Sequence, residues 1–255
     1  MTIIAPADYS VWNINGFAGV LNFVNASFTD PGTADTHTCK IDWGNGGPAE
    51  YGTINETNGS GTCKLTPSAN PYLSLGAGIY TMTVTVKDDD YGEGSASRTL
   101  IVYDPAAGFV TGGGWITSPL GAYIPNPGLT GKANFGFVSK YQKNNPNTPV
   151  GNTEFQFHAG NLNFHSENYD WLLVNKEGTN AQYKGTGSIN GVNGYKFMLW
   201  AADGGGYDTF RMKIWTDQGG EVIVYDNMGS SGGYSTVPIG GGSIVIHTNG
   251  GVASK

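Results

Sequence analysis

Five aspartates in the N-terminal half fall in two predicted loops and carry oxygen ligands suited to a hard cation: Asp30, Asp35, Asp88, Asp89 and Asp90. In a two-sheet sandwich, the loops after the second and sixth strands emerge at the same end. Carboxylates brought together there repel by about 1 kcal/mol per pair at about 4 Å even in bulk water. Ca²⁺ takes about six to eight oxygen ligands, so we expect calcium at this end. The alternative is that these aspartates cap turns and face solvent.

A second set of residues has sugar-binding chemistry. The predicted hairpin around the Gly-rich turn at 203–208 would place Trp200, Arg211, Lys213 and Trp215 on one face, with Trp200 opposite Arg211. Indole rings stack on pyranose rings, and charged groups hold their hydroxyls. Under the alternative interpretation, other strands cover this face and bury both tryptophans. Exposure of the two indoles distinguishes the two interpretations.

The sequence offers little evidence for a catalytic site. Ser166 lies beside His165, but no third group stands at a position recognisable as part of a catalytic triad. A predicted turn at 159–160 pairs Glu154 with His165, but glycoside hydrolysis needs two carboxylates flanking the bond. His158 and His165 project from the same strand face three pairs apart, too far to share one zinc ion. We therefore expect a protein that is not an enzyme.

The two cysteines, Cys39 and Cys63, both lie in the first half of the chain. An isolated pair in a Gly- and Thr-rich β sequence is more typical of a disulfide than of a metal or redox site. A bridge would close a loop of about 25 residues and indicate an oxidising compartment. Two buried, reduced thiols are the alternative.

Composition limits the possible partners. The 255 residues include 41 glycines and 12 prolines, and aromatic residues make up 12%. The net charge of -7 disfavours nucleic acid and anionic membranes. No apolar stretch approaches the roughly 20 residues that span a bilayer. Residues 1–6 show neither the basic nor the apolar region of a signal peptide, so we expect the native one to be absent or replaced by a start methionine.

The secondary-structure pattern predicts an all-β protein of two β-sandwich modules in tandem. Short segments rich in Thr, Val, Ile, Tyr and Phe recur at a spacing of about 8 to 12 residues. In residues 79–86, the side chains of Tyr80, Met82, Val84 and Val86 alternate with threonines, so we expect these four to face the core. No helix is predicted.

The first module resembles a polycystic-kidney-disease (PKD) domain. The resemblance rests on Asp42-Trp43-Gly44-Asn45-Gly46, on residues 78–86 and on the three aspartates 88–90. It covers about residues 15–104 and implies a seven-stranded Ig-like sandwich within a domain of residues 1–104. Such modules serve as extracellular spacers or adhesion domains. Asn45 departs from the more usual Asp, which weakens metal binding at that turn.

The second module resembles one found at the C-termini of large secreted and surface-bound bacterial proteins. The similar blocks lie at 109–116, 131–138, 183–187, 210–215 and 240–247. We expect a β-rich domain of residues 109–248, folded as a sandwich, after a short linker at 104–108, with a flexible tail at 249–255. The resemblance implies localisation and architecture and no particular activity.

These observations lead to one expectation and one alternative. We expect a monomeric, extracellular, non-catalytic structural or adhesive module pair of a larger secreted or cell-surface bacterial protein. Its partners would be a surface or matrix polysaccharide, or neighbouring modules of the parent protein. The alternative is a carbohydrate-binding module attached to a polysaccharide-degrading enzyme.

Overall fold

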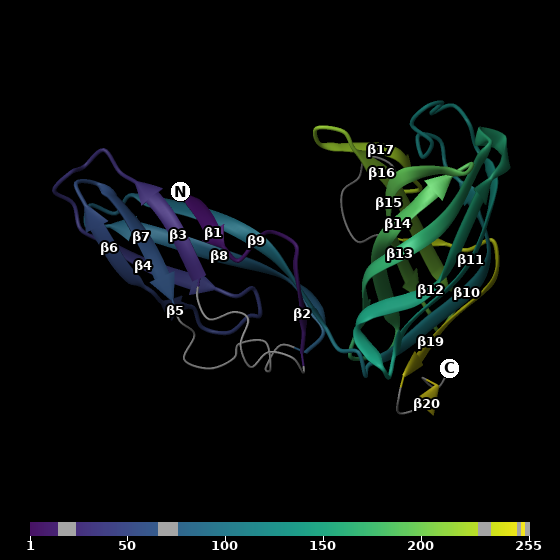
Figure 1. The fold of residues 1–255 in the computed structure, drawn as a ribbon, viewed down its shortest axis with the longest axis horizontal. Helices are drawn as coiled ribbons and strands as arrows, with labels where there is room; N and C mark the ends of the chain where they lie inside the picture. Colours follow the sequence, from purple (N-terminus) through teal and green to yellow (C-terminus); the bar gives the residue numbers. More distant parts are fainter. Residues whose placement is uncertain (15–23, 66–75, 229–235, 249–250, 253–255) are drawn as a thin grey trace. The chain divides into compact units, whose positions relative to one another are not determined.

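The computed structural model describes residues 1–14, 24–65, 76–228, 236–248 and 251–252 (Figure 1). Over these residues the regular structure consists of strands and one short 3-10 turn, η2 (His158–Gly160), so the all-β fold class is confirmed. The described segments contain no helix that is long and apolar enough to cross a membrane. The chain divides into two compact units, Met1–Asp104 and Pro105–Lys255. The predicted tail lies almost wholly outside the described residues.

The first unit contains two sheets. One has the order β1-β3-β7-β6 and the other β2-β9-β8-β4-β5, and all pairs are antiparallel except β2 with β9. The strands are β1 (Thr2–Ala5), β2 (Ser10–Asn13), β3 (Val24–Thr29), β4 (His37–Asp42), β5 (Glu50–Tyr51), β6 (Thr53–Thr57), β7 (Ser60–Leu65), β8 (Gly78–Asp88) and β9 (Glu93–Tyr103).

The core of the first unit follows from strand alternation. On β8, Met82, Val84 and Val86 are buried and Tyr80 packs partly buried against the same cluster, which confirms the predicted core face. β3 contributes Val24, Ala26 and Phe28 from the other sheet, and Cys39 and Ile41 come from β4. Every second residue of a strand points to the same face, so the two sheets bury one continuous apolar layer.

The second unit is built on a single sheet of eleven strands in the order β17-β16-β15-β14-β13-β12-β11-β10-β19-β20, with β18 on β16, and its pairs are antiparallel. The strands are β10 (Gly108–Ser118), β11 (Gly131–Gln142), β12 (Asn145–Phe157), β13 (Leu162–Val174), β14 (Asn180–Ile189), β15 (Val192–Ala202), β16 (Thr209–Asp217), β17 (Glu221–Asp226), β18 (Val237–Pro238), β19 (Gly241–Thr248) and β20 (Gly251–Val252).

This sheet curls so that its two halves face each other. Phe135 on β11 stacks on Phe210 of β16 with ring centroids 4.1 Å apart, although four strands separate β11 from β16 in the sheet. Phe155 likewise meets Tyr225 at 4.7 Å. Long strands with the usual right-handed twist coil in this way. The two facing layers expected of a sandwich therefore belong, in this unit, to one continuous sheet.

Glycine triplets allow β10 and β19 to approach closely. A Cβ on Gly114 would lie 2.2 Å from the Gly241 carbonyl oxygen, and one on Gly242 would lie 2.1 Å from that of Gly113. Any larger residue would force these strands apart. The Gly-rich runs at 112–114 and 240–242 therefore have a packing reason as well as a turn-forming one.

Candidate functional site

The five predicted cation-ligand residues lie at one end of the first unit, four of them in loops and Asp88 at the end of β8. We call Asp30, Asp35, Asp88, Asp89 and Asp90 the acidic end. The pKa of the Asp35 carboxyl is raised, first by partial desolvation and then by repulsion from Asp89, Asp30, Asp90 and Asp88. The backbone N–H of Thr36 donates to Asp89 Oδ1 at 3.1 Å, which ties the two loops together. The structure thus brings together the loops that the sequence analysis paired.

Two of these carboxylates also cap turns. Asp30 Oδ1 accepts the Gly32 N–H at 2.6 Å, and Asp88 Oδ1 accepts the Gly92 N–H at 2.7 Å. The described residues hold no group of three or more His, Cys, Asp or Glu side chains arranged to bind one metal ion. Turn capping is therefore visible in the structure, whereas calcium binding by the acidic end stays a prediction.

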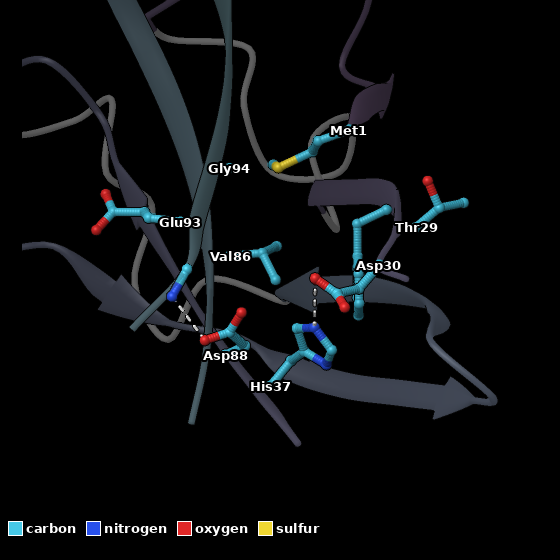
Figure 2. A pocket seen from close by; sticks show the side chains of 10 residues that line it. Met1, Thr29, Asp30, His37, Val86, Asp88, Glu93 and Gly94 are labelled. Atoms are coloured by element: carbon cyan, nitrogen blue, oxygen red, sulfur yellow. Dashed lines mark hydrogen bonds and ion pairs between the residues drawn. The ribbon is translucent and has the colours of Figure 1, made fainter. Parts of the chain in front are cut away.

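A pocket beside the acidic end contains a histidine that the sequence analysis did not select. The pocket measures about 200 Å³, and its lining includes Asp30, His37, Asp88 and Glu93, with apolar walls from Met1, Phe28 and Val86 (Figure 2). His37 is the direct cross-strand partner of Asp88 in the β4–β8 pair. The His37 side chain is only 3% exposed.

The two nitrogens of the His37 ring have different surroundings. Nδ1 lies 2.6 Å from Glu56 Oε2, and the His37 backbone N–H donates to Glu56 Oε1 at 3.2 Å, so one carboxylate orients the residue. The ring also packs on Phe28, with centroids 4.6 Å apart. Among the residues that the structure describes, Nε2 has no hydrogen-bond partner, and it lies 3.9 Å from Asp30 Oδ2. Strand alternation carries the signal for this residue, because His37 shares its face of β4 with buried Cys39 and Ile41.

The predicted aromatic and cationic face of the second unit has the expected register. Trp200 pairs with Arg211, and Lys196 pairs with Trp215. Trp200, Arg211 and Trp215 are nevertheless buried, with exposed fractions of 8%, 6% and 7%. The Arg211 guanidinium lies 4.5 Å from the Trp200 ring centroid, and the Lys213 amine lies 5.3 Å from that of Trp215.

Carboxylates of the neighbouring strand β17 form ion pairs with Arg211 and Lys213. Arg211 Nε and Nη2 donate to Asp226 Oδ1 and Oδ2 at 2.9 and 2.7 Å, and Lys213 donates to Glu221 at 2.6 Å. Each indole is stacked by a cation that already has a partner. The face therefore lacks the exposed rings that sugar stacking requires, and both tryptophans are buried, as in the alternative interpretation of the sequence. The sequence analysis did not place β17 beside β16, so it missed the carboxylates that pair with the two cations.

The Glu154–His165 pair forms on the predicted register, with Oε1 and Nδ1 2.5 Å apart on a partly exposed surface. The turn differs from the prediction: His158 begins η2, and the Asn161 N–H donates to the His158 carbonyl. Ser166 is buried, and its Oγ accepts the Thr153 N–H at 2.8 Å. This engagement leaves Ser166 poorly placed as a nucleophile for His165.

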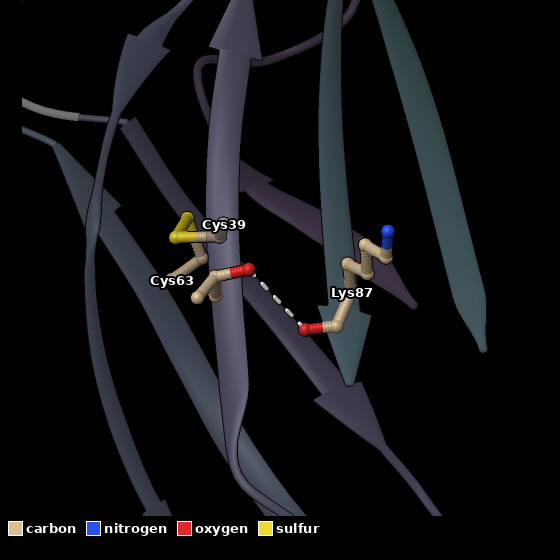
Figure 3. Close-up of a disulfide and its surroundings, with 4 residues drawn as sticks. Cys39, Cys63 and Lys87 are labelled. Atoms are coloured by element: carbon tan, nitrogen blue, oxygen red, sulfur yellow. Dashed lines mark hydrogen bonds between the residues drawn. A yellow bond between two sulfur atoms is a disulfide. The ribbon is translucent and has the colours of Figure 1, made fainter. Parts of the chain in front are cut away.

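The predicted disulfide between Cys39 and Cys63 is confirmed. It joins β4 of one sheet to β7 of the other, and both cysteines are buried (Figure 3). It is therefore a covalent link through the core between the two sheets. No known protein-family model matches the chain, and no curated protein is similar enough to count as a relative, so the PKD resemblance stays a prediction.

Proposed function

We propose that this chain is a non-catalytic, extracellular structural and adhesive module pair within a larger secreted or cell-surface bacterial protein. The observation that carries the proposal is the buried Cys39–Cys63 bridge between the two sheets. Structural disulfides form and persist in oxidising compartments. A covalent tie between the sheets also resists their separation, which suits a module that transmits load.

The chemistry of the described polar clusters supports a role without catalysis. His165 pairs with Glu154 at the surface, while the adjacent Ser166 hydroxyl is engaged inside the sheet. The cations of the Trp200–Trp215 face are held by carboxylates of the same unit. These groups stabilise the fold, and none of them pairs a nucleophile with a base at an open cleft.

The proposal is tested with the chain secreted through an oxidising compartment and coupled to beads. We expect the beads to be retained on intact bacterial surfaces or on fragments of the parent protein. The chain should release no reducing sugar from a panel of polysaccharides, and the unfolded, unreduced protein should contain no thiol that can be alkylated. Turnover of any panel substrate, or two free thiols by mass spectrometry, would contradict the proposal.

A glycan array separates the proposal from the carbohydrate-binding alternative. Specific glycan binding that Trp215→Ala abolishes without unfolding the protein would show that the buried face opens to a sugar. A matched substitution, Trp115→Ala, controls for the general loss of an indole, because Trp115 lies on β10 and contacts Lys132 instead.

A further inference from the structure

We propose that the pocket at the acidic end binds a primary alkylammonium group, such as the side chain of a lysine presented by a partner. The polar wall of the pocket includes His37, Asp30 and Asp88, which come from β4, the segment after β3 and the end of β8. Figure 2 shows the carboxylates of Asp30 and Asp88 beside the His37 ring. Binding at this pocket is independent of the adhesive role proposed above.

His37 brings a buried ring nitrogen to the pocket. Nδ1 lies 2.6 Å from Glu56 Oε2, and in the tautomer that donates to this carboxylate Nε2 carries a lone pair at the wall of the pocket. A buried acceptor without a donor is costly. Asp30 Oδ2, at 3.9 Å, is too distant for a hydrogen bond and is itself an acceptor. A positively charged donor would therefore satisfy both His37 Nε2 and Asp30 Oδ2.

The pocket is also rich in negative charge. Asp30 and Asp88 each commit one oxygen to a backbone N–H and keep a second oxygen for another donor. Among the described residues, the ion pairs of the acidic end involve only His37, at 3.9 Å from Asp30. An ammonium group carries three N–H donors and no acceptor. It would supply one donor each to Nε2, Asp30 and Asp88 and would reduce the repulsion within the acidic end.

The size and the apolar walls of the pocket suit a ligand with an aliphatic stem. About 200 Å³ is far more than a bare ion fills, and Phe28, Val86 and Met1 offer apolar contact to an aliphatic stem. Lysine combines such a stem with a charged head. The described residues do not gather three ligands for one metal ion, which favours an organic cation over a metal.

The test is an NMR titration of the ¹⁵N-labelled chain with n-butylammonium, with n-butanol as the probe of equal stem and no charge. We expect saturable shifts at the His37 ring and at the amides of β4 and β8, with a dissociation constant of about 1 mM for so small a ligand. n-Butanol should leave these resonances unchanged. Nα-acetyl-lysine methylamide should bind at the same resonances.

Asp30→Asn should weaken n-butylammonium binding about tenfold or more, because it removes the charge but keeps the oxygen that accepts the Gly32 N–H. Asp42→Asn is the matched control: its carboxylate accepts the Gly44 N–H in the same way, at the opposite end of β4. Asp88→Asn is the second variant should Asp30→Asn fail to fold.

Three results would overturn the proposal. Equal shifts with n-butanol and n-butylammonium would show apolar contact alone. Equal affinity in Asp30→Asn and Asp42→Asn would place the binding elsewhere. Saturation of the same resonances by Zn²⁺ or Ca²⁺, with no response to either amine, would make the pocket a metal site.

Discussion

Removing Asp226 should be among the most damaging single substitutions in the second unit. Its carboxylate accepts two hydrogen bonds from Arg211, and both side chains are 7% exposed. In Asp226→Ala, the guanidinium stays buried against Trp200 without a counter-charge. Breaking a buried pair in this way costs about 3 to 5 kcal/mol. For a unit of this size we expect its melting temperature to fall by about 6 to 20 °C.

The measurement is calorimetry together with tryptophan fluorescence, which reports on Trp200 beside the pair. Asp217→Ala is the control, since the Lys196–Asp217 pair is exposed and its loss should cost less than about 1 kcal/mol. Replacing the pair by Arg211→Met with Asp226→Leu should recover most of the stability, because no buried charge then lacks a partner. If Asp226→Ala is no less stable than Asp217→Ala, the pair is not a buried, mutually dependent unit and the reasoning is refuted.

Further outcomes are expected. Substituting Cys39 and Cys63 by serine should lower the stability of the first unit by about 3 to 4 kcal/mol in chemical denaturation, and an unchanged midpoint would contradict a structural role for the bridge. Calcium at 100 times its dissociation constant should stabilise that unit by about 2.7 kcal/mol in thermal melts, whereas identical melts with calcium and with chelator would exclude the calcium site. The raised pKa of Asp35 means that its charged form is disfavoured in the fold, so Asp35→Asn should stabilise the unit at neutral pH. This gain in stability should vanish as the pH falls below the ordinary pKa of an Asp side chain. A gain at every pH would point to another cause. Thr153→Val should cost about 1 to 3 kcal/mol, because Thr153 Oγ1 lies 2.9 Å from the buried Tyr183 hydroxyl; Thr153→Ser keeps the hydroxyl and should cost less.

Local pattern was enough to predict much of the architecture. Period-two alternation identified the buried face of β8 at Met82, Val84 and Val86. The pairs Glu154–His165 and Trp200–Arg211 could be predicted from the sequence, because a hairpin pairs neighbouring segments in a register set by its turn. The disulfide followed from having only two cysteines. All of these features depend on residues close in sequence or on composition.

Tertiary structure alone determined which distant segments meet. The curl that stacks Phe135 on Phe210 is a property of the whole twisted sheet, and no single strand carries a signal for it. Asp226 reaches Arg211 through a strand pair with an irregular register, so spacing could not reveal that the guanidinium is buried and neutralised. The pocket joins Asp30, His37 and Asp88 from three separate segments. Its chemistry depends on the burial of His37 Nε2 beside Asp30, and this burial arises only when the sheets have packed.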